Sequence, residues 1–291
     1  MRKQIGYIGL GKMGSAMVAR LKEAGWCVES YDVSGKGTAK SIEQLAEKLQ
    51  KPRVVWIMVP AGKPVDTVVS SLAELLDRGG DVVIDGGNSF YEDSIKRAKR
   101  LGAKGIAFLD VGVSGGPGTV RQGKPAVMVG GDKKVFQKLK PLFADITNKE
   151  RLGYMGTSGT GHYVKMVHNG IEYGMMQALA EGFTLMKKSP FELDLKEVAR
   201  VYNNGSVIES RLTGWMQAGF KKYGQELQEV AGSVQHTGEG KWTVQTAKKL
   251  GVRVPVIEHA FKFRVESEKK PSYTGKILSL LRHMFGGHSI K

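Results

Sequence analysis

The six residues GLGKMG, from Gly9 to Gly14, constrain the fold of this chain more than any other feature. They match the pattern G-x-G-x-x-G, follow the apolar run KQIGYI and precede SAMVARLKEAG, which has helical periodicity. In a strand–turn–helix context, the first glycine makes the tight turn, the second admits a pyrophosphate and the third lets helix and strand pack closely. The predicted dinucleotide-binding residues are Gly9, Leu10, Gly11, Lys12, Met13 and Gly14.

An acidic residue is expected about 20 residues beyond this motif, at the end of the second strand. Asp32 occupies that place, in ESYDVSG. A carboxylate there accepts hydrogen bonds from both ribose hydroxyls and repels a 2′-phosphate, so the predicted cofactor is NAD, with NADP less favoured. The alternative is a tight turn that binds no cofactor, with Asp32 as a solvated loop residue.

Strand-like and helix-like segments are unevenly distributed along the chain. The strand-like runs are KQIGYIG, CVESYDV, RVVWIMV, DVVIDGG, IAFLDVGV and AVMVGG. They alternate with helical segments, which is typical of a parallel sheet covered by helices on both faces. From Thr157 onward only helical segments follow, with breaks at SPFELD, YNNGS and GVRVP. We therefore predict a doubly wound α/β Rossmann-type domain, residues 1–156, followed by an all-α domain, residues 157–291.

The net charge of +16 is large for 291 residues and suggests nucleic acid or an anionic small molecule as partner, or merely a lysine-rich surface. The basic residues are spread along the chain without a long basic run, which disfavours nucleic acid. Cys27 is the only cysteine, which excludes an internal disulfide and fits a reducing compartment. No apolar run approaches the roughly 18 residues of a membrane-spanning helix. We expect a cytoplasmic protein that binds neither nucleic acid nor membrane.

Three further loops follow predicted strands, where ligands bind in open α/β sheets. VPAG contributes Val59, Pro60 and Ala61 as candidate cofactor contacts. DGGNS contributes Asn88, which could bridge nicotinamide and substrate. GVSGG offers backbone N–H groups and the hydroxyl of Ser114, which suit a carboxylate or a polyol. Any one of these loops could be a plain turn, but three at successive strand ends predict the floor of a pocket.

The segment KMVHNGIEYG, residues 165–174, lies in a long predicted helix, GTGHYVKMVHNGIEYGMMQALAEGFTLMKK. Helical spacing places its polar members on or beside one face. They are Lys165, His168, Asn169, Glu172 and Tyr173. The other faces are predicted to pack through Met166, Ile171 and Met175. The alternative is a solvated, salt-bridged face, which three glycines, a histidine and an asparagine fit poorly.

A lysine in a partly desolvated pocket can lose its proton near neutral pH and accept that of a hydroxyl while hydride passes to NAD. A carboxylic acid on the same face could later deliver a proton to carbon. Lys165 and Glu172 therefore suit an oxidation that is followed by a second proton transfer. The sequence contains no cluster of metal ligands, and no metal is predicted.

KMVHNGIEYG, with GLGKMG, DGGNS, GVSGG and RHMFGGH in this order, resembles 6-phosphogluconate dehydrogenase, the decarboxylating enzyme, over the whole chain. The length resembles the short form of that family. The resemblance implies oxidation of 6-phospho-D-gluconate to ribulose 5-phosphate and carbon dioxide, as in gluconate use and the pentose phosphate pathway. It also implies that the helical domain binds substrate and forms a homodimer.

The resemblance also implies roles for single residues. Lys165 is then the general base on the 3-hydroxyl, and Glu172 is the general acid at C1. The implied sugar-acid contacts are Asn88, Ser114, Gly115, Gly116, His168 and Asn169, with Tyr173 on the phosphate. Protonated Lys165 polarises the keto group, so that the loss of carbon dioxide needs no metal.

The tail RHMFGGH contains Arg282 and His288. Gly286 and Gly287 permit a turn that returns His288 to Arg282, although the tail could instead be solvated. In the resembling family, this arginine and histidine complete the substrate site of the neighbouring subunit, with the arginine on the phosphate. We therefore expect an active site shared between the subunits of a homodimer.

Three departures from the long form of the family concern the anion-binding positions. Asp32, Val33 and Ser34 stand where the long form has Asn-Arg-Thr, so the arginine for a 2′-phosphate is missing. In HTGEGKWT, Thr237 replaces a phosphate-binding lysine and Glu239 replaces a threonine. Near Phe263, either Lys262 or Arg264 could supply another phosphate-binding cation.

Two rival functions remain open from the sequence. A related β-hydroxyacid dehydrogenase or semialdehyde reductase for a smaller or unphosphorylated acid, such as 3-hydroxyisobutyrate, would keep the lysine without requiring His168 or Glu172. A basic nucleotide-sensing or nucleic-acid-binding module would need no acid–base pair on one helix.

Overall fold

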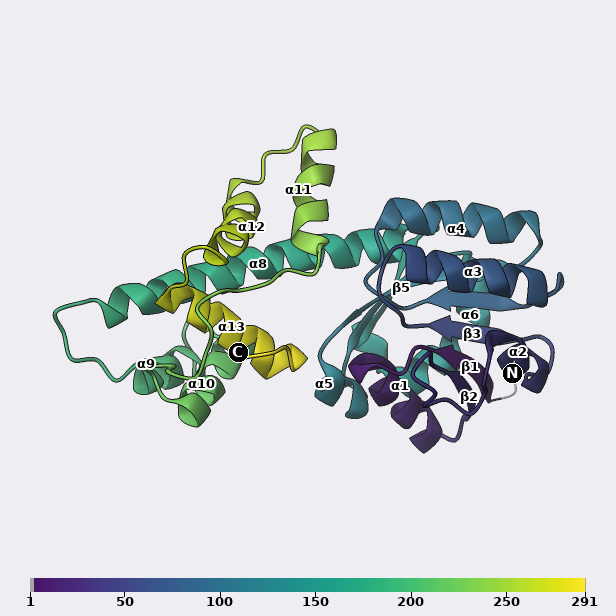
Figure 1. The fold of residues 1–291 in the computed structure, drawn as a ribbon, viewed down its shortest axis with the longest axis horizontal. Coiled ribbons are helices and arrows are strands. Elements are labelled where there is room, and N and C mark those ends of the chain that lie inside the picture. The colour runs from purple at the N-terminus through teal and green to yellow at the C-terminus, as the bar shows by residue number, and fades with distance from the viewer. Residues whose placement is uncertain (1–2, 291) are drawn as a thin grey trace. The chain divides into compact units, whose positions relative to one another are not determined.

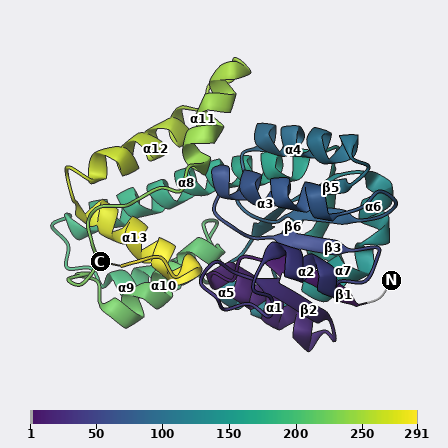
Figure 2. The ribbon, with the colours of Figure 1, turned by 45° about the vertical axis from the view of Figure 1, so that its right-hand side comes forward.

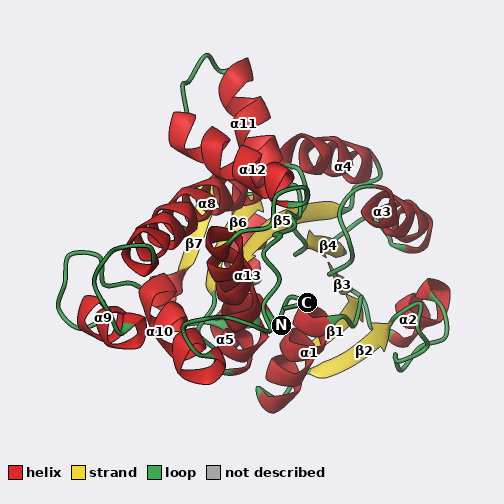
Figure 3. Ribbon diagram, turned by 60° about the vertical axis from the view of Figure 1, so that its left-hand side comes forward, coloured by secondary structure: helices red, strands yellow, loops and turns green. Residues whose placement is uncertain are grey.

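The computed structural model describes residues 3–290. It divides into two compact units, Met1–Met166 and Val167–Lys291, and the division falls inside helix α8, Thr160–Lys187 (Figure 1). The strands belong to the first unit, and the described part of the second unit is built from helices (Figure 3). Each unit is described below by itself.

The first unit contains one seven-stranded sheet with the order β2-β1-β3-β4-β5-β6-β7. Its strands are β1 (Gln4–Ile8), β2 (Cys27–Tyr31), β3 (Val54–Ile57), β4 (Val82–Asp85), β5 (Ala107–Ser114), β6 (Ala126–Gly131) and β7 (Leu152–Gly156). The first five are parallel, and the predicted Rossmann-type α/β domain is confirmed. The sheet ends at Gly156.

Two features of the sheet differ from the expectation. Strand β6 runs antiparallel to β5, because the short link after Ser114 leaves too little chain for a parallel crossover, which needs a dozen residues or more. Strand β7, in LGYMG, was not predicted. It pairs parallel with β6, but it contains two glycines and no β-branched residue, so its composition gives no strand signal.

The helices of the first unit cover both faces of the sheet. They are α1 (Lys12–Glu23), α2 (Ile42–Lys48), α3 (Lys63–Leu75), α4 (Tyr91–Ala103), α5 (Pro117–Arg121), α6 (Lys133–Lys138) and α7 (Lys140–Ile146). Because side chains alternate along a strand, Val54 and Trp56 of β3 lie in one apolar cluster with α1, α6 and α7. Val55 and Ile57 lie in a second cluster with α2, α3 and α4, and Figure 2 shows α3 and α4 together on one side of the sheet.

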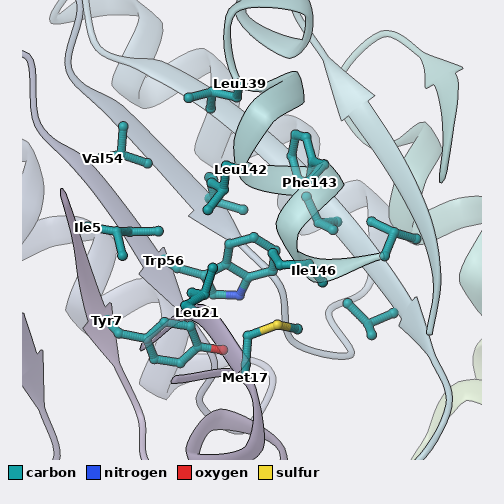
Figure 4. Packing of buried hydrophobic residues seen from close by; sticks show 14 of the residues in the cluster. Ile5, Tyr7, Met17, Leu21, Val54, Trp56, Leu139, Leu142, Phe143 and Ile146 are labelled. Carbon is teal, nitrogen blue, oxygen red and sulfur yellow. The ribbon is translucent and has the colours of Figure 1, made fainter. Parts of the chain in front are cut away.

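Trp56 lies at the centre of the first cluster (Figure 4). Its ring stacks on Tyr7, with centroids 6.2 Å apart and planes 9° apart, and it meets Phe143 of α7 in an edge-on contact. Such aromatic pairs add to the stabilisation gained from burial alone. The cluster thereby fixes β1, which leads into the glycine loop.

The second unit packs the rest of α8 with α9 (Leu195–Tyr202), α10 (Arg211–Tyr223), α11 (Glu239–Lys249), α12 (Pro255–Ser267) and α13 (Tyr273–Gly286). Met176, Ala180 and Phe183 of α8 enter its core, which also takes apolar residues from α9, α10 and α13. The predicted breaks at residues 189–194, 202–206 and 251–255 all fall at helix ends or between helices.

The long predicted helix is present as α8, but its packing residues were only partly predicted. Met166 is 2% exposed, as expected, whereas Ile171 is 52% exposed and Met175 is 47% exposed. The prediction that these two residues pack within the chain is wrong for the described residues. No helix in the described part of the chain is both long enough and apolar enough to cross a membrane.

Candidate active site

The glycine loop after β1 has the geometry that a dinucleotide requires. Gly9 has a φ of +100°, and a Cβ added to it would lie 2.3 Å from the carbonyl oxygen of Met58. A Cβ on Gly14 would lie 2.0 Å from the carbonyl oxygen of Gly9, so the close packing of α1 requires glycine. A Cβ on Gly11 would meet nothing within 4 Å. A pyrophosphate can approach the N-terminus of α1 from that open side.

Asp32 follows β2 and is tied to the glycine loop. The backbone N–H of Leu10 donates to its Oδ2 at 2.6 Å, and the N–H and hydroxyl of Ser34 donate to its Oδ1 at 2.8 and 2.5 Å. The Ser34 hydroxyl, followed by the two N–H groups, holds the pKa of Asp32 below its ordinary value. The carboxylate is therefore ionised at neutral pH. The neighbouring Val33 is exposed and offers no cation for a 2′-phosphate.

The DGGNS loop after β4 is held by its first residue, Asp85, which is fully buried. Its carboxylate accepts from the N–H of Gly87 at 3.1 Å and from the hydroxyl of Ser89 at 2.7 Å, and Arg97 lies 3.4 Å away. These bonds fix the turn and leave Asn88 exposed.

The predicted loops of the first unit share one edge of its sheet. Because β1, β3, β4 and β5 are parallel, the segments that follow them emerge on the same side. The edge therefore brings together Gly9–Gly14, Val59–Ala61, Asn88 and Ser114–Gly116. This is the edge at which open α/β sheets bind their ligands.

The start of α8 is anchored to β5 by Asp110, which the sequence analysis did not identify. Asp110 is fully buried, and its two carboxylate oxygens accept from the N–H groups of Gly159 at 2.7 Å and His162 at 2.9 Å. An anion suits a helix N-terminus because it meets unpaired N–H groups and the positive end of the helix dipole. A Cβ on Gly161 would lie 2.3 Å from the carbonyl oxygen of Asp110, so backbone packs directly on backbone.

Lys165 lies one turn further along α8 and is 7% exposed. A Cβ added to Gly112 of β5 would lie 2.4 Å from the Cβ of Lys165. The first glycine of GVSGG therefore makes room for the lysine stem, a role in addition to the N–H groups expected from the motif. Lys165 is thus held beside the strand that carries Ser114.

Three polar residues of α8 lie within the second unit close to one another. Nδ1 of His168 lies 3.0 Å from Oδ1 of Asn169 and 3.9 Å from Oε2 of Glu172. The His168 and Glu172 side chains are 39% and 25% exposed, so both remain accessible. Asn169 also donates from Nδ2 to Oε1 of Glu239 on α11 at 3.1 Å.

Tyr173 and two arginines form a buried cationic cluster in the second unit. The guanidinium carbon of Arg264 lies 3.4 Å from the centroid of the Tyr173 ring. Burial lowers the pKa of Arg264 to about 10 and also lowers that of Arg282, and it raises the pKa of Tyr173. Tyr173, Glu172 and Glu239 are the charged or titratable neighbours that act on Arg282.

Of the two cations that the sequence left open, Arg264 is buried and Lys262 is exposed. Arg264 is 3% exposed, whereas the side chain of Lys262 is 56% exposed and pairs with Glu258 at 3.1 Å. Ala260 and Arg264 are four residues apart and therefore share a face of α12. This spacing could have indicated that Arg264 is buried together with Ala260. A charged residue on an apolar stripe was the available clue.

The C-terminal tail forms the turn that its glycines predict. Gly287 caps α13 in the left-handed conformation with a φ of +63°, and Nδ1 of His288 lies 3.4 Å from Nη2 of Arg282. The described residues contain no group of three or more His, Cys, Asp or Glu side chains that could hold a metal ion.

A dinucleotide-type glycine loop, an acidic residue at the end of β2 and a buried lysine beside β5 define a dehydrogenase of the Rossmann class. Residues 4–156 match the profile described as the NAD binding domain of 6-phosphogluconate dehydrogenase, and residues 161–283 match that of its C-terminal domain. The chain belongs to the 6-phosphogluconate dehydrogenase family.

Individual relatives agree with this assignment. The chain is 41% identical over 298 residues to the NAD(+)-dependent, decarboxylating 6-phosphogluconate dehydrogenase of Haloferax volcanii, covering 99% of this chain and 98% of that one. It is 36% identical to the Bacillus subtilis enzyme of the same description, covering 93% of this chain but 62% of that longer one. It is also similar to the solved 6-phosphogluconate dehydrogenase of Plasmodium falciparum, with a TM-score of 0.77, 28% identity, and coverage of 97% of this chain and 70% of that one. The chain is thus a short form.

Replacing Gly112 with alanine should displace Lys165, because the new Cβ overlaps the lysine stem. We expect kcat to fall by about tenfold or more and the free energy of unfolding to fall by about 1–3 kcal/mol from overpacking. Steady-state kinetics and urea denaturation measure the two effects. Gly102→Ala is the matched control, since its Cβ meets nothing within 4 Å. Equal behaviour of the two variants would refute the packing role of Gly112.

Asp32 should determine the choice of cofactor. Asp32→Asn removes the repulsion of a 2′-phosphate, and adding Val33→Arg supplies a cation that pairs with it. We expect the unmodified protein to have the higher kcat/KM with NAD and the double variant to shift toward NADP by at least about tenfold. Asp32→Asn alone should lie between them. An unmodified protein that prefers NADP would contradict the role given to Asp32.

Proposed function

We propose that this chain catalyses the oxidative decarboxylation of 6-phospho-D-gluconate to D-ribulose 5-phosphate and carbon dioxide, with NAD as the electron acceptor. The observation that carries the proposal is Lys165, buried beside Gly112 at the end of β5, with Glu172 two turns further along the same helix. The names of the relatives from Haloferax volcanii and Bacillus subtilis state this activity and this cofactor.

Lys165 would supply the first proton transfer. In its neutral form, the amine of Lys165 would take the proton of the substrate 3-hydroxyl. The glycine loop and Asp32 would hold NAD, which would supply the acceptor for the hydride from the same carbon. The resulting ammonium of Lys165 then polarises the 3-keto oxygen, so that the electrons of the breaking C1–C2 bond are drawn toward the carbonyl as carbon dioxide leaves. Glu172 finally protonates the enediol at the carbon that has lost the carboxylate.

The remaining site residues would hold the sugar acid. Asn88, Ser114, Gly115 and Gly116 lie at the ligand-binding edge of the sheet and would contact the carboxylate and hydroxyls. His168 and Asn169 would contact hydroxyls from α8. These contacts are proposed from position and chemistry, since the loops present N–H, amide and hydroxyl groups.

The phosphate would be held by Tyr173, Arg264 and Arg282. Burial disfavours the charge of both arginines and Arg282 adds to this cost for Arg264, and a dianion would relieve that cost. Arginine also binds phosphate oxygens bidentately. This pair compensates for Thr237, which stands where the long form of the family carries a lysine.

The activity is tested by incubating the protein with NAD and three acids in turn: 6-phosphogluconate, gluconate and 3-hydroxyisobutyrate. We expect NADH and carbon dioxide in equal amounts from 6-phosphogluconate alone. Lys165→Met should lower kcat by about 100- to 10,000-fold, the usual contribution of a general base. Oxidation without release of carbon dioxide, or a preference for 3-hydroxyisobutyrate, would support the rival dehydrogenase and refute the proposal.

The phosphate site is tested by comparing two cations on α12. Arg264→Met keeps a long side chain against Tyr173 but removes the charge, and it should raise KM for 6-phosphogluconate by roughly 100-fold. The inhibition constant of gluconate, which lacks the phosphate, should change little. Lys262→Met is the matched control and should leave both values unchanged, because Lys262 is exposed. Similar KM values for the two variants would overturn the assignment of Arg264.

We also propose that the protein is a cytoplasmic homodimer. The exposed Ile171 and Met175 lie one turn apart on α8, and a partner subunit would remove their apolar surface from water. The resemblance assigned Arg282 and His288 to the neighbouring subunit's site. Within one chain, however, Arg282 is 9% exposed and interacts with its own Tyr173, Glu172 and Glu239. We therefore revise that expectation and propose that Arg282 serves the site of its own chain.

Subunit complementation distinguishes the two arrangements. Arg282→Ala chains and Lys165→Met chains are mixed under conditions that allow subunits to exchange, with exchange followed by mass-tagged chains. If Arg282 acts within its own chain, every site in the mixed dimer lacks one essential residue and activity should not return. Recovery of about half the activity expected for the mixed dimers would show that the arginine acts in the neighbouring subunit.

A further inference from the structure

We infer that Glu239 is a positioning residue that orients the Asn169 amide and, through it, selects the tautomer of His168. The inference deepens the proposed function, because His168 and Asn169 are proposed substrate contacts. Glu239 is the first residue of α11, lies in the second unit with both partners and is 3% exposed. Its Oε1 accepts from Nδ2 of Asn169 at 3.1 Å.

The chemistry of the carboxylate fixes the direction of each hydrogen bond. Nδ2 of Asn169 donates to Oε1 of Glu239, so the NH₂ group of Asn169 faces Glu239. The amide oxygen of Asn169 then faces His168, whose Nδ1 lies 3.0 Å away. Because that oxygen can only accept, Nδ1 of His168 must carry the proton. In the neutral ring, Nε2 is left as an acceptor.

This arrangement has two consequences for the proposed reaction. Nε2 of His168 can accept a hydrogen bond from a substrate hydroxyl, whereas the other tautomer could only donate from that atom. The proton on Nδ1 is also engaged by Asn169, while Oε2 of Glu172 lies 3.9 Å from Nδ1, beyond hydrogen-bond distance. The Glu172 carboxyl is therefore not committed to His168 and stays available for proton transfer to carbon.

The residue type at position 239 supports the inference. A threonine, which the resemblance places here in the long form, has a hydroxyl that both donates and accepts and so would leave the Asn169 amide free to flip. The second oxygen of Glu239, Oε2, is buried and has no hydrogen-bond partner among the described residues. A buried carboxylate with an unsatisfied oxygen is costly, so its presence calls for a role other than packing.

The tautomer of His168 can be measured directly in the substrate-free protein. Protein labelled with ¹⁵N-histidine is studied by two-bond ¹H–¹⁵N correlation at a pH above the titration of His168, and its signals are assigned by their loss in His168→Gln. The unmodified protein should show a protonated Nδ1 and an unprotonated Nε2. The opposite tautomer in the unmodified protein would overturn the inference without any variant being needed.

Two variants test the role of Glu239 itself. Glu239→Gln keeps the shape but can also donate, so His168 should become a mixture of tautomers. The double variant Glu239→Gln, Asn169→Asp restores a fixed direction of hydrogen bonding. The new carboxylate at position 169 can only accept, from the amide at position 239 and from Nδ1 of His168, so the protonated Nδ1 should return. Glu258→Gln, which removes a half-buried carboxylate of α12 that pairs with Lys262, is the control and should change nothing. An unchanged tautomer in a folded Glu239→Gln protein would refute the positioning role.

Kinetics then connect the tautomer to the reaction. Glu239→Gln should raise KM for 6-phosphogluconate by about tenfold with a smaller change in kcat, as expected when a binding contact is misaligned. A raised KM without a change of tautomer would show that Glu239 acts by another route and would contradict the inference. Lack of activity in the unmodified protein would instead reject the proposed function, and the tautomer measurement would still decide the role of Glu239.

Discussion

The hydrogen bonds from the first turn of α8 to the buried Asp110 carboxylate set the position of Lys165. A buried charge must find partners, and Asp110 finds them in the N–H groups of Gly159 and His162. Gly161 and Gly112 then allow α8 and β5 to approach closely, and the stem of Lys165 fills the space that a side chain at position 112 would occupy. Lys165 is therefore held beside β5 within the first unit, and His168, Asn169 and Glu172 follow in the next turns of α8, in the second unit.

The second unit contains a cluster of buried charged side chains. Arg264 and Arg282 are buried near each other, and Tyr173 covers the guanidinium of Arg264. A pKa of about 10 still leaves Arg264 charged at neutral pH. Glu239 and Glu172 offset part of that charge. The cluster is therefore suited to an anionic ligand that neutralises the remaining positive charge. A phosphorylated sugar acid is such a ligand, and the cluster is one place where the large positive net charge of the chain could serve binding.

Much of the fold and part of the candidate site could be predicted because they depend on patterns among residues that are close together in the sequence. The glycine spacing, the position of Asp32 and the polar stripe on α8 depend on residues near in sequence. The direction of β6 depends on the length of a link, and Arg264 faces its cluster only through packing of distant helices. The exposure of Ile171 and Met175 could not be foreseen, because periodicity shows which residues are apolar but not which of them the same chain covers.

The central claim is that base and acid are carried by one helix, with Glu172 acting after Lys165. It is tested most directly by single turnover of Glu172→Gln with 6-phosphogluconate in deuterium oxide, following NADH, carbon dioxide and deuterium at C1 of the product. The account predicts that NADH and carbon dioxide form at rates within about tenfold of the unmodified enzyme, while deuteration at C1 slows by about 100-fold or more. Loss of NADH formation in Glu172→Gln, or deuteration at C1 at an unchanged rate, would contradict it.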